Sequence, residues 1–158
     1  MNIEDIKLAC VAGFFSALVL GFLSWLNNIG GYGLWLMAPF GATAVLVFGI
    51  PNSPLAQPKN VIFGHLLTAF VGIVFVTYVG DGSVSIALAV GFAITLMMLT
   101  KTVHPAAGAN PILIIVSGQS WDFLIMPVLV GTMFIVICGF AAKWLLSSTV
   151  NRAHKKTA

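Results

Sequence analysis

The sequence predicts an all-α integral membrane protein: a bundle of about six transmembrane segments, two of them short or broken. Hydrophobic residues make up 59% of the 158 residues and charged residues only 7%, whereas soluble domains carry about 25% charged residues. The apolar residues also fall into runs separated by turn-forming residues, and about 20 apolar residues span a bilayer as a helix. We therefore expect residues 1–158 to form one membrane domain, with residues 1–6 and 148–158 as cytoplasmic tails.

The segments follow from where these apolar runs begin and end. The first run begins near Leu8 after residues that are not basic, and no small-residue cleavage pattern ends it, so we expect a mature helix rather than a signal peptide. The second run is short and contains Pro39, so we expect it to be broken near Pro39–Thr43. The predicted segments are 7–26, 34–50, 61–79, 84–100, 106–116 and 123–146.

Basic residues predict the orientation of the chain. If residues 104–118 cross the membrane, then Lys59, Lys101, Lys143 and the basic tail all lie on one side, and the opposite loops lack Lys and Arg. Re-entry of residues 104–118 would put the tail outside, against the positive-inside rule. We expect both termini to be cytoplasmic, in a bacterial inner membrane because no transit segment precedes the first helix. The tail then reports orientation, and we expect no nucleic-acid partner.

One stretch stands out from this scaffold. His104–Pro111 reads His-Pro-Ala-Ala-Gly-Ala-Asn-Pro and precedes an apolar run long enough for only half a bilayer. A weaker copy lies at Pro39–Gly49, and each copy falls in the middle of a group of three segments. Groups of three would give an inverted 3+3 repeat, a design in which broken helices form a ligand site near the midplane. The alternative is chance, because Gly-Ala followed by aliphatic residues is common in membrane helices.

A helix that begins inside the membrane exposes unpaired N–H groups at the positive end of its dipole. Two such starts, at Pro39–Thr43 and His104–Asn110, predict a site for a small, anionic solute. Glycines there would allow a ligand or an opposing backbone to come close, and the lysine and histidines would add charge or protons. The predicted site residues are Gly41, Ala42, Thr43, His65, Lys101, His104, Gly108, Ala109 and Asn110.

Each charged or titratable member also has a structural interpretation. Lys101 can extend to the cytoplasmic interface, His104 can cap the following helix or bind a carbonyl, and His65 can lie at the membrane interface. We expect no enzyme activity, because the sequence shows no nucleophile–base pair and no phosphate loop. His65, His104 and His154 do not form a metal signature. No metal or other cofactor is expected.

The motifs at 39–49 and 104–111 resemble those of the HPP family of membrane proteins, named for a His-Pro-Pro tripeptide. The first motif continues through Pro51 and Ser53–Asn60 to Gly64-His65, and the resemblance covers most of residues 10–146. Ala106 departs from the family pattern, where a second proline is usual. The family is described with about four membrane helices, and some members are implicated in nitrite transport. The resemblance therefore implies a transporter or channel for nitrite or a similar small inorganic anion.

Two functional hypotheses remain open from the sequence. The first is an anion transporter in which protonation of His104 favours the anion or couples its movement to H⁺, since imidazole titrates near neutral pH. The second is a non-transporting membrane partner or assembly subunit, whose glycine-rich helix faces bind other helices in the lipid bilayer. Glycine-rich faces also predict a homo-oligomer.

Overall fold

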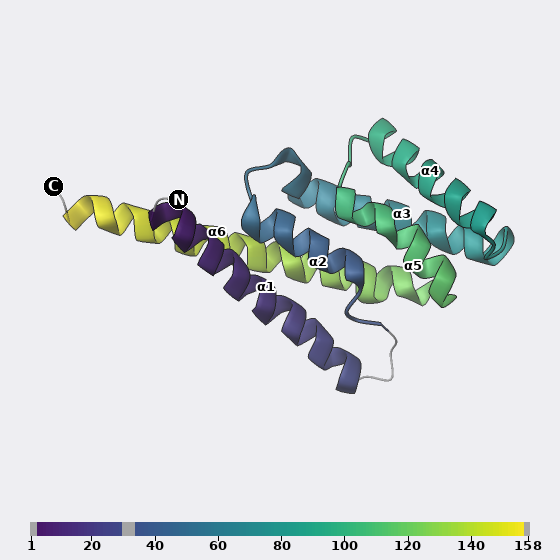
Figure 1. The fold of residues 1–158 in the computed structure, drawn as a ribbon, viewed down its shortest axis with the longest axis horizontal. Helices are drawn as coiled ribbons and strands as arrows, with labels where there is room; N and C mark the ends of the chain where they lie inside the picture. The colour runs from purple at the N-terminus through teal and green to yellow at the C-terminus, as the bar shows by residue number, and fades with distance from the viewer. Residues whose placement is uncertain (1–2, 30–33, 157–158) are drawn as a thin grey trace.

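The computed structural model describes residues 3–29 and 34–156, and side chains throughout these ranges except at position 4 and from 146 onward. Within them the chain is an all-α bundle of six α-helices joined by shorter 3-10 and π segments, which confirms the predicted fold class (Figure 1). Helix α6 continues through most of the predicted tail 148–158, but the basic side chains of that tail, Arg152 included, lie outside the described residues.

Three helices carry stretches long and apolar enough to cross a membrane: α1 (Ile3–Ile29), α3 (Pro58–Tyr78) and α6 (Val130–Lys156). The other apolar helices are shorter. Helix α4 spans Ser83–Leu99, α2 (Ala38–Ala44) continues into the π segment η1 (Val45–Gly49), and the 3-10 segment η3 (Pro105–Ala109) continues into α5 (Asn110–Ser117). Two connecting segments complete the order, η2 at Pro54–Ala56 and the π segment η4 at Leu124–Leu129.

The second segment differs from its prediction. No helix is broken near Pro39–Thr43. Instead a helix begins at Ala38, with Pro39 in its first turn, where a missing N–H costs nothing because that group would have no helical partner. Upstream, Asn27 Oδ1 at the end of α1 accepts hydrogen bonds from the backbone N–H groups of Trp35 and Leu36, at 2.6 and 3.2 Å. The irregular part lies at the other end, in η1.

The two short helices run in opposite directions from the middle of the molecule (Figure 1). Helix α2 with η1 runs toward the end that holds both termini, and η3 with α5 runs toward the turn between α3 and α4. Their starting regions touch, since α2 packs against η3. At 1.5 Å per residue, twelve and thirteen residues extend only about 18–20 Å, so each short helix covers about half to two-thirds of a bilayer.

Close glycine contacts attach α5 to α3. A Cβ at Gly64 would lie 2.9 Å from the Thr102 carbonyl oxygen and 3.0 Å from the His104 Cβ, and one at Gly72 would lie 2.9 Å from the Pro111 Cα. Along both helices the partners advance in the same direction, so the stretch 104–117 runs parallel to α3 and does not turn back. This direction agrees with a crossing rather than a re-entrant segment.

A matching pair of glycines lies on α6. A Cβ at Gly131 would meet the Phe40 ring at 2.5 Å, and one at Gly139 would meet Val47 Cγ1 at 2.5 Å. The spacing of eight residues is the same as between Gly64 and Gly72, and again the helices run parallel. Helix α3, the third helix of the first half, thus packs on α5 of the second half, and α6, the third helix of the second half, packs on α2 of the first half. The α3–α5 pair and the α6–α2 pair run in opposite directions. This reciprocal packing supports the inverted 3+3 repeat.

We predict that Gly72→Ala destabilises the protein by about 1–3 kcal/mol, because the new methyl group would overlap the backbone at Pro111. Gly91→Ala on α4 is the matched control, since no atom lies within 4 Å of its added Cβ, and its stability should be unchanged or slightly higher. Thermal unfolding in detergent measures both. Equal midpoints for the two variants would contradict the close approach of α3 and α5.

Candidate functional site

Four polar side chains meet at the starts of the two short helices, deep in an apolar bundle. Thr43 comes from the second turn of α2, His65 from α3, His104 from the residue before η3, and Asn110 from the first position of α5. None of the four has any exposed surface. Polar groups at such depth are costly unless they bind one another, so their mutual hydrogen bonds are a condition of the fold. We call these four residues the polar cluster.

The Thr43 hydroxyl is the centre of the polar cluster. Its Oγ1 lies 2.8 Å from His65 Nε2 and 3.0 Å from His104 Nε2. It also lies 3.0 Å from the backbone carbonyl oxygen of Pro39, one turn earlier on the same helix. The two imidazole rings therefore converge on one oxygen atom, with their centroids 5.1 Å apart.

The backbone fixes the proton on His104. Its Nδ1 lies 2.8 Å from the Leu55 carbonyl oxygen, beside η2. A carbonyl oxygen can only accept, so Nδ1 carries the proton and donates it. In the neutral ring, Nε2 is then an acceptor facing the Thr43 hydroxyl. This contact also ties the loop before α3 to the start of η3.

Asn110 fixes the tautomer of His65 in the same way. The amide Nδ2 lies 3.0 Å from His65 Nδ1, 3.1 Å from the His65 carbonyl oxygen and 2.9 Å from Thr68 Oγ1. An amide nitrogen only donates, so His65 Nδ1 accepts and the ring proton is on Nε2, where it points to Thr43. The carbonyl of His65 prevents the reverse amide orientation, because two oxygens would then face each other.

One buried acceptor of the polar cluster has no partner among the described residues. Asn110 Oδ1 is inaccessible and receives no hydrogen bond there. Native proteins rarely leave such an atom unsatisfied, and exceptions often mark functional positions. The position is suited to a solute or water that brings a donor.

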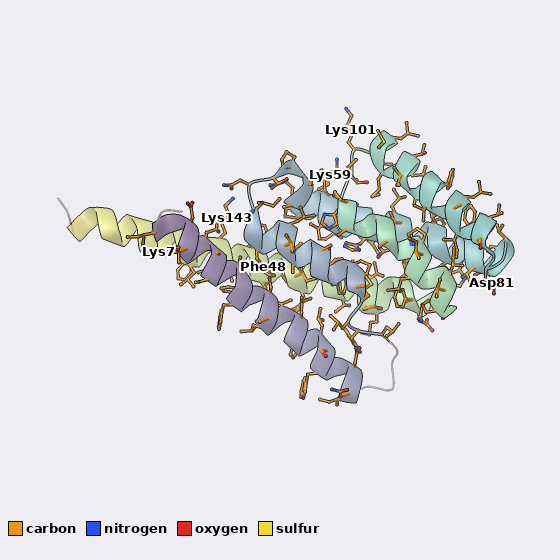
Figure 2. All side chains as sticks on the ribbon, in the orientation of Figure 1. Lys7, Phe48, Lys59, Asp81, Lys101 and Lys143 are labelled. Carbon is orange, nitrogen blue, oxygen red and sulfur yellow. The ribbon has the colours of Figure 1, made fainter. Side chains whose placement is uncertain are left out.

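The structure brings together only part of the predicted site. Thr43, His65, His104 and Asn110 form the polar cluster, whereas Lys101 is exposed and points away from the bundle in Figure 2. Lys101 is in the left-handed region, with φ 55°, in the turn after α4. Its placement agrees with the interfacial interpretation and gives it no direct part in the polar cluster.

The small residues of the predicted site are less buried than the polar cluster. Gly41 and Gly108 are half-buried, and Ala42 and Ala109 are exposed. No atom lies within 4 Å of a Cβ built on either glycine, so neither glycine is needed for backbone approach within one protomer. That role belongs to Gly64 and Gly72. The space beside Gly41 and Gly108 is open to a ligand, lipid or neighbouring chain.

Two of the structural interpretations can now be judged. The interfacial placement of His65 is wrong, because Phe40 packs edge-on against its ring at a centroid distance of 5.6 Å and the residue is fully buried. His104 precedes η3, but its side chain makes no capping hydrogen bond. Its bond to a carbonyl is confirmed, the carbonyl being that of Leu55.

Sequence reasoning missed three contributors. Thr68 accepts from Asn110 and donates to the backbone of its own helix, at the Gly64 and His65 carbonyls, 2.9 and 3.2 Å away. Its position three residues after His65 places it on the same helix face, a signal that was available. The carbonyls of Pro39 and Leu55 carried no such signal, because any residue supplies a carbonyl.

The polar cluster has no metal-binding composition: among the described residues, no group of three or more His, Cys, Asp or Glu side chains could hold a metal ion. The four acidic residues of the whole sequence, Glu4, Asp5, Asp81 and Asp122, lie near the N-terminus or in turns. What remains is a neutral set of donors and acceptors that can bind a small solute or a proton.

Comparison with known proteins gives one family and two relatives. The family model described as "HPP, transmembrane region" matches residues 1–151. Two transmembrane proteins of Dictyostelium discoideum are 35% and 34% identical to this chain over 86% of its length. The matches cover 46% and 50% of those proteins, so the chain spans about half the length of both. No solved structure matches the chain.

We predict that His65→Phe destabilises the protein by about 1–3 kcal/mol, because Asn110 and Thr43 each lose a buried partner while the ring volume is kept. Tyr78→Phe, also on α3 but exposed, removes a polar group of similar kind and should change stability by less than about 0.5 kcal/mol. Unfolding midpoints in detergent test both, and an undisturbed His65→Phe would disprove the assigned hydrogen bonds.

Proposed function

Because the chain belongs to the HPP family of membrane proteins, we propose that it transports a small inorganic anion through the region where its two short helices begin. The observation that carries this proposal is the buried polar cluster at that meeting point. A purely structural bundle gains little from two histidines, a threonine and an asparagine at this depth, where each requires a partner.

The electrostatics of this region favour an anion. Both short helices begin there, and helix starts carry a partial positive charge. The four acidic residues of the sequence lie near the N-terminus or in turns, away from the polar cluster. The proposed site therefore comprises Thr43, His65, His104 and Asn110, with Gly41 and Gly108 leaving space beside them.

The proposed entrance on one side is a small cavity that none of the polar-cluster residues lines. It measures about 50 Å³ and lies between η1, the loop around η2, and α6. Gln57 and Lys143 contribute to its lining, and Lys143 Nζ also donates to Asn52 Oδ1 at 3.1 Å. Ala56 and Gln57 directly follow Leu55, whose carbonyl binds His104. A lysine beside this cavity would concentrate anions near the proposed site.

The choice of nitrite as the anion rests on the resemblance to family members implicated in nitrite transport. The residues themselves favour any small, polar, monovalent anion. The proposed role is transport rather than catalysis.

We also propose that the end of the bundle that bears Lys59, Lys101 and Lys143 faces the cytoplasm of a bacterium. These lysines lie away from Asp81, which occupies the opposite end of the bundle in Figure 2. The proposal follows from the positive-inside rule.

A homo-oligomer is a further part of the proposal. The exposed Ala42 and Ala109, beside half-buried Gly41 and Gly108, allow another helix to approach closely. A second protomer there would cover the outer side of the same helix starts.

We predict nitrite flux into proteoliposomes that hold the purified protein, above that of protein-free vesicles. Gly108→Leu should reduce this flux by at least about tenfold, because leucine fills the space beside η3, directly before α5. An added Cβ at Gly108 meets no atom within 4 Å, and the unfolding midpoint in detergent checks that the whole leucine side chain leaves the fold intact.

Gly91→Leu is the matched control, because an added Cβ there also meets no atom within 4 Å and the position on α4 lies outside the site. Its flux should equal that of the wild type. Absence of flux for nitrite, nitrate, formate and chloride in the wild type would refute the transport proposal and favour the assembly-subunit hypothesis.

We predict that a membrane-impermeant maleimide labels Ser83→Cys on intact cells, whereas it labels Asn52→Cys only after permeabilisation. Both positions are exposed. Cys10 and Cys138 are first replaced by alanine, so that each variant has a single thiol. The reverse labelling pattern would invert the proposed orientation.

A further inference from the structure

We propose that the polar cluster binds one proton, on His104 Nε2, together with the anion, so that the protein moves one proton with each anion. This inference rests on the proposed anion transport and adds a second, coupled substrate. It follows from the number and direction of the hydrogen bonds around Thr43 Oγ1.

His65 does not take up this proton. Its Nδ1 faces the amide nitrogen of Asn110 at 3.0 Å, and that nitrogen is a donor. A proton on Nδ1 would therefore point at the N–H of the amide. Its Nε2 already carries a proton, directed at Thr43 Oγ1 2.8 Å away. His104 differs, because only its Nδ1 is committed, to the Leu55 carbonyl. Its Nε2 retains a lone pair.

The Thr43 hydroxyl has two possible acceptors for its single hydrogen: His104 Nε2 and the Pro39 carbonyl, each 3.0 Å from Oγ1. With His104 neutral, the hydroxyl donates to Nε2. When a proton from water binds Nε2, that nitrogen becomes a donor to Oγ1, and the hydroxyl turns to the Pro39 carbonyl. Every donor and acceptor around Oγ1 then has a partner. Binding one proton changes only hydrogen-bond directions and adds one positive charge.

That charge makes proton and anion binding mutually dependent. A lone charge buried in an apolar bundle is strongly unfavourable, whereas a charge paired with an opposite one is far less so. The anion therefore increases the affinity for the proton, and by linkage the proton increases the affinity for the anion to the same extent. The loaded site is neutral, and so is the empty one.

The unpartnered Asn110 Oδ1 is a second observation that points to a ligand at the polar cluster, because this buried acceptor requires a donor. A water molecule that accompanies the anion supplies this donor through one of its own O–H groups, while the transferred proton resides on His104 Nε2. This observation is independent of the Thr43 geometry.

The surroundings of His104 contain little else that could titrate. Of the elements packed around it, α2, η2, α4 and α5 have no titratable side chain. Helix α3 carries Lys59 and Tyr78 besides His65, and both are exposed, as is Lys101 in the turn before His104. In the described part of the chain, His65 is the titratable group that faces His104, and its own proton is fixed.

The test is the proton-to-nitrite ratio in proteoliposomes containing a pH-sensitive dye. It is measured at alkaline pH, where undissociated nitrous acid, which crosses lipid unaided, is scarce, and protein-free vesicles give the background. We expect one proton to enter with each nitrite, and a nitrite flux that does not respond to an imposed potassium diffusion potential. Nitrite flux that responds to this potential without proton uptake would overturn the proton proposal and leave anion transport intact. Absence of nitrite flux would overturn both.

Three variants locate the coupling. Thr43→Val removes the hydroxyl and should lower coupled flux at least about tenfold, because the protonated His104 loses its acceptor. Thr43→Ser restores the hydroxyl and should restore the flux. Thr132→Val is the matched control: Thr132 is fully buried and its hydroxyl binds the Val128 carbonyl at 2.7 Å, outside the polar cluster. Full coupled flux in a folded Thr43→Val protein would overturn the proposal. If that variant does not fold, the proton-to-nitrite ratio of the wild type decides.

Discussion

The three contacts of Thr43 Oγ1 are the interaction on which the rest of the structure depends. This oxygen joins α2, α3 and the start of η3 through hydrogen bonds of 2.8–3.0 Å. In an apolar medium a buried hydroxyl, two imidazoles and an amide cannot be solvated by bulk water. Their positions are therefore coupled, and a shift of either short helix would leave several polar groups without partners.

Glycine makes this arrangement possible by setting how closely the helices pack. Gly64 and Gly72 bring α3 against the stretch that contains His104 and Asn110. Gly131 and Gly139 bring α6 against Phe40 and Val47 of the other short helix. The helices that hold the site are thus positioned by backbone contact, which is rigid, and the polar groups need only small adjustments to bind one another. Each of the two long helices packs through its glycine pair on a short helix of the other half, which is the arrangement that an inverted repeat would produce.

The same geometry links fold to the proposed function. Two short helices that begin in the middle of the molecule direct their positive ends into its interior, where the described residues place two histidines but no carboxylate. In the proposed function this region holds an anion and the proton that balances its charge, because each offsets the cost of burying the other.

The sequence by itself determined the membrane class, the positions of the apolar segments and the importance of residues 39–49 and 104–111. These follow from composition and from local breaks in hydrophobic runs, which do not depend on how the helices pack. It also identified all four members of the polar cluster, although not as a cluster. Only the tertiary structure decided that Thr43 bridges the two histidines, that Lys101 lies outside the site and that His65 is fully buried. Those features depend on contacts between residues 22–61 positions apart and on backbone carbonyls at Pro39 and Leu55, which no side-chain pattern reveals.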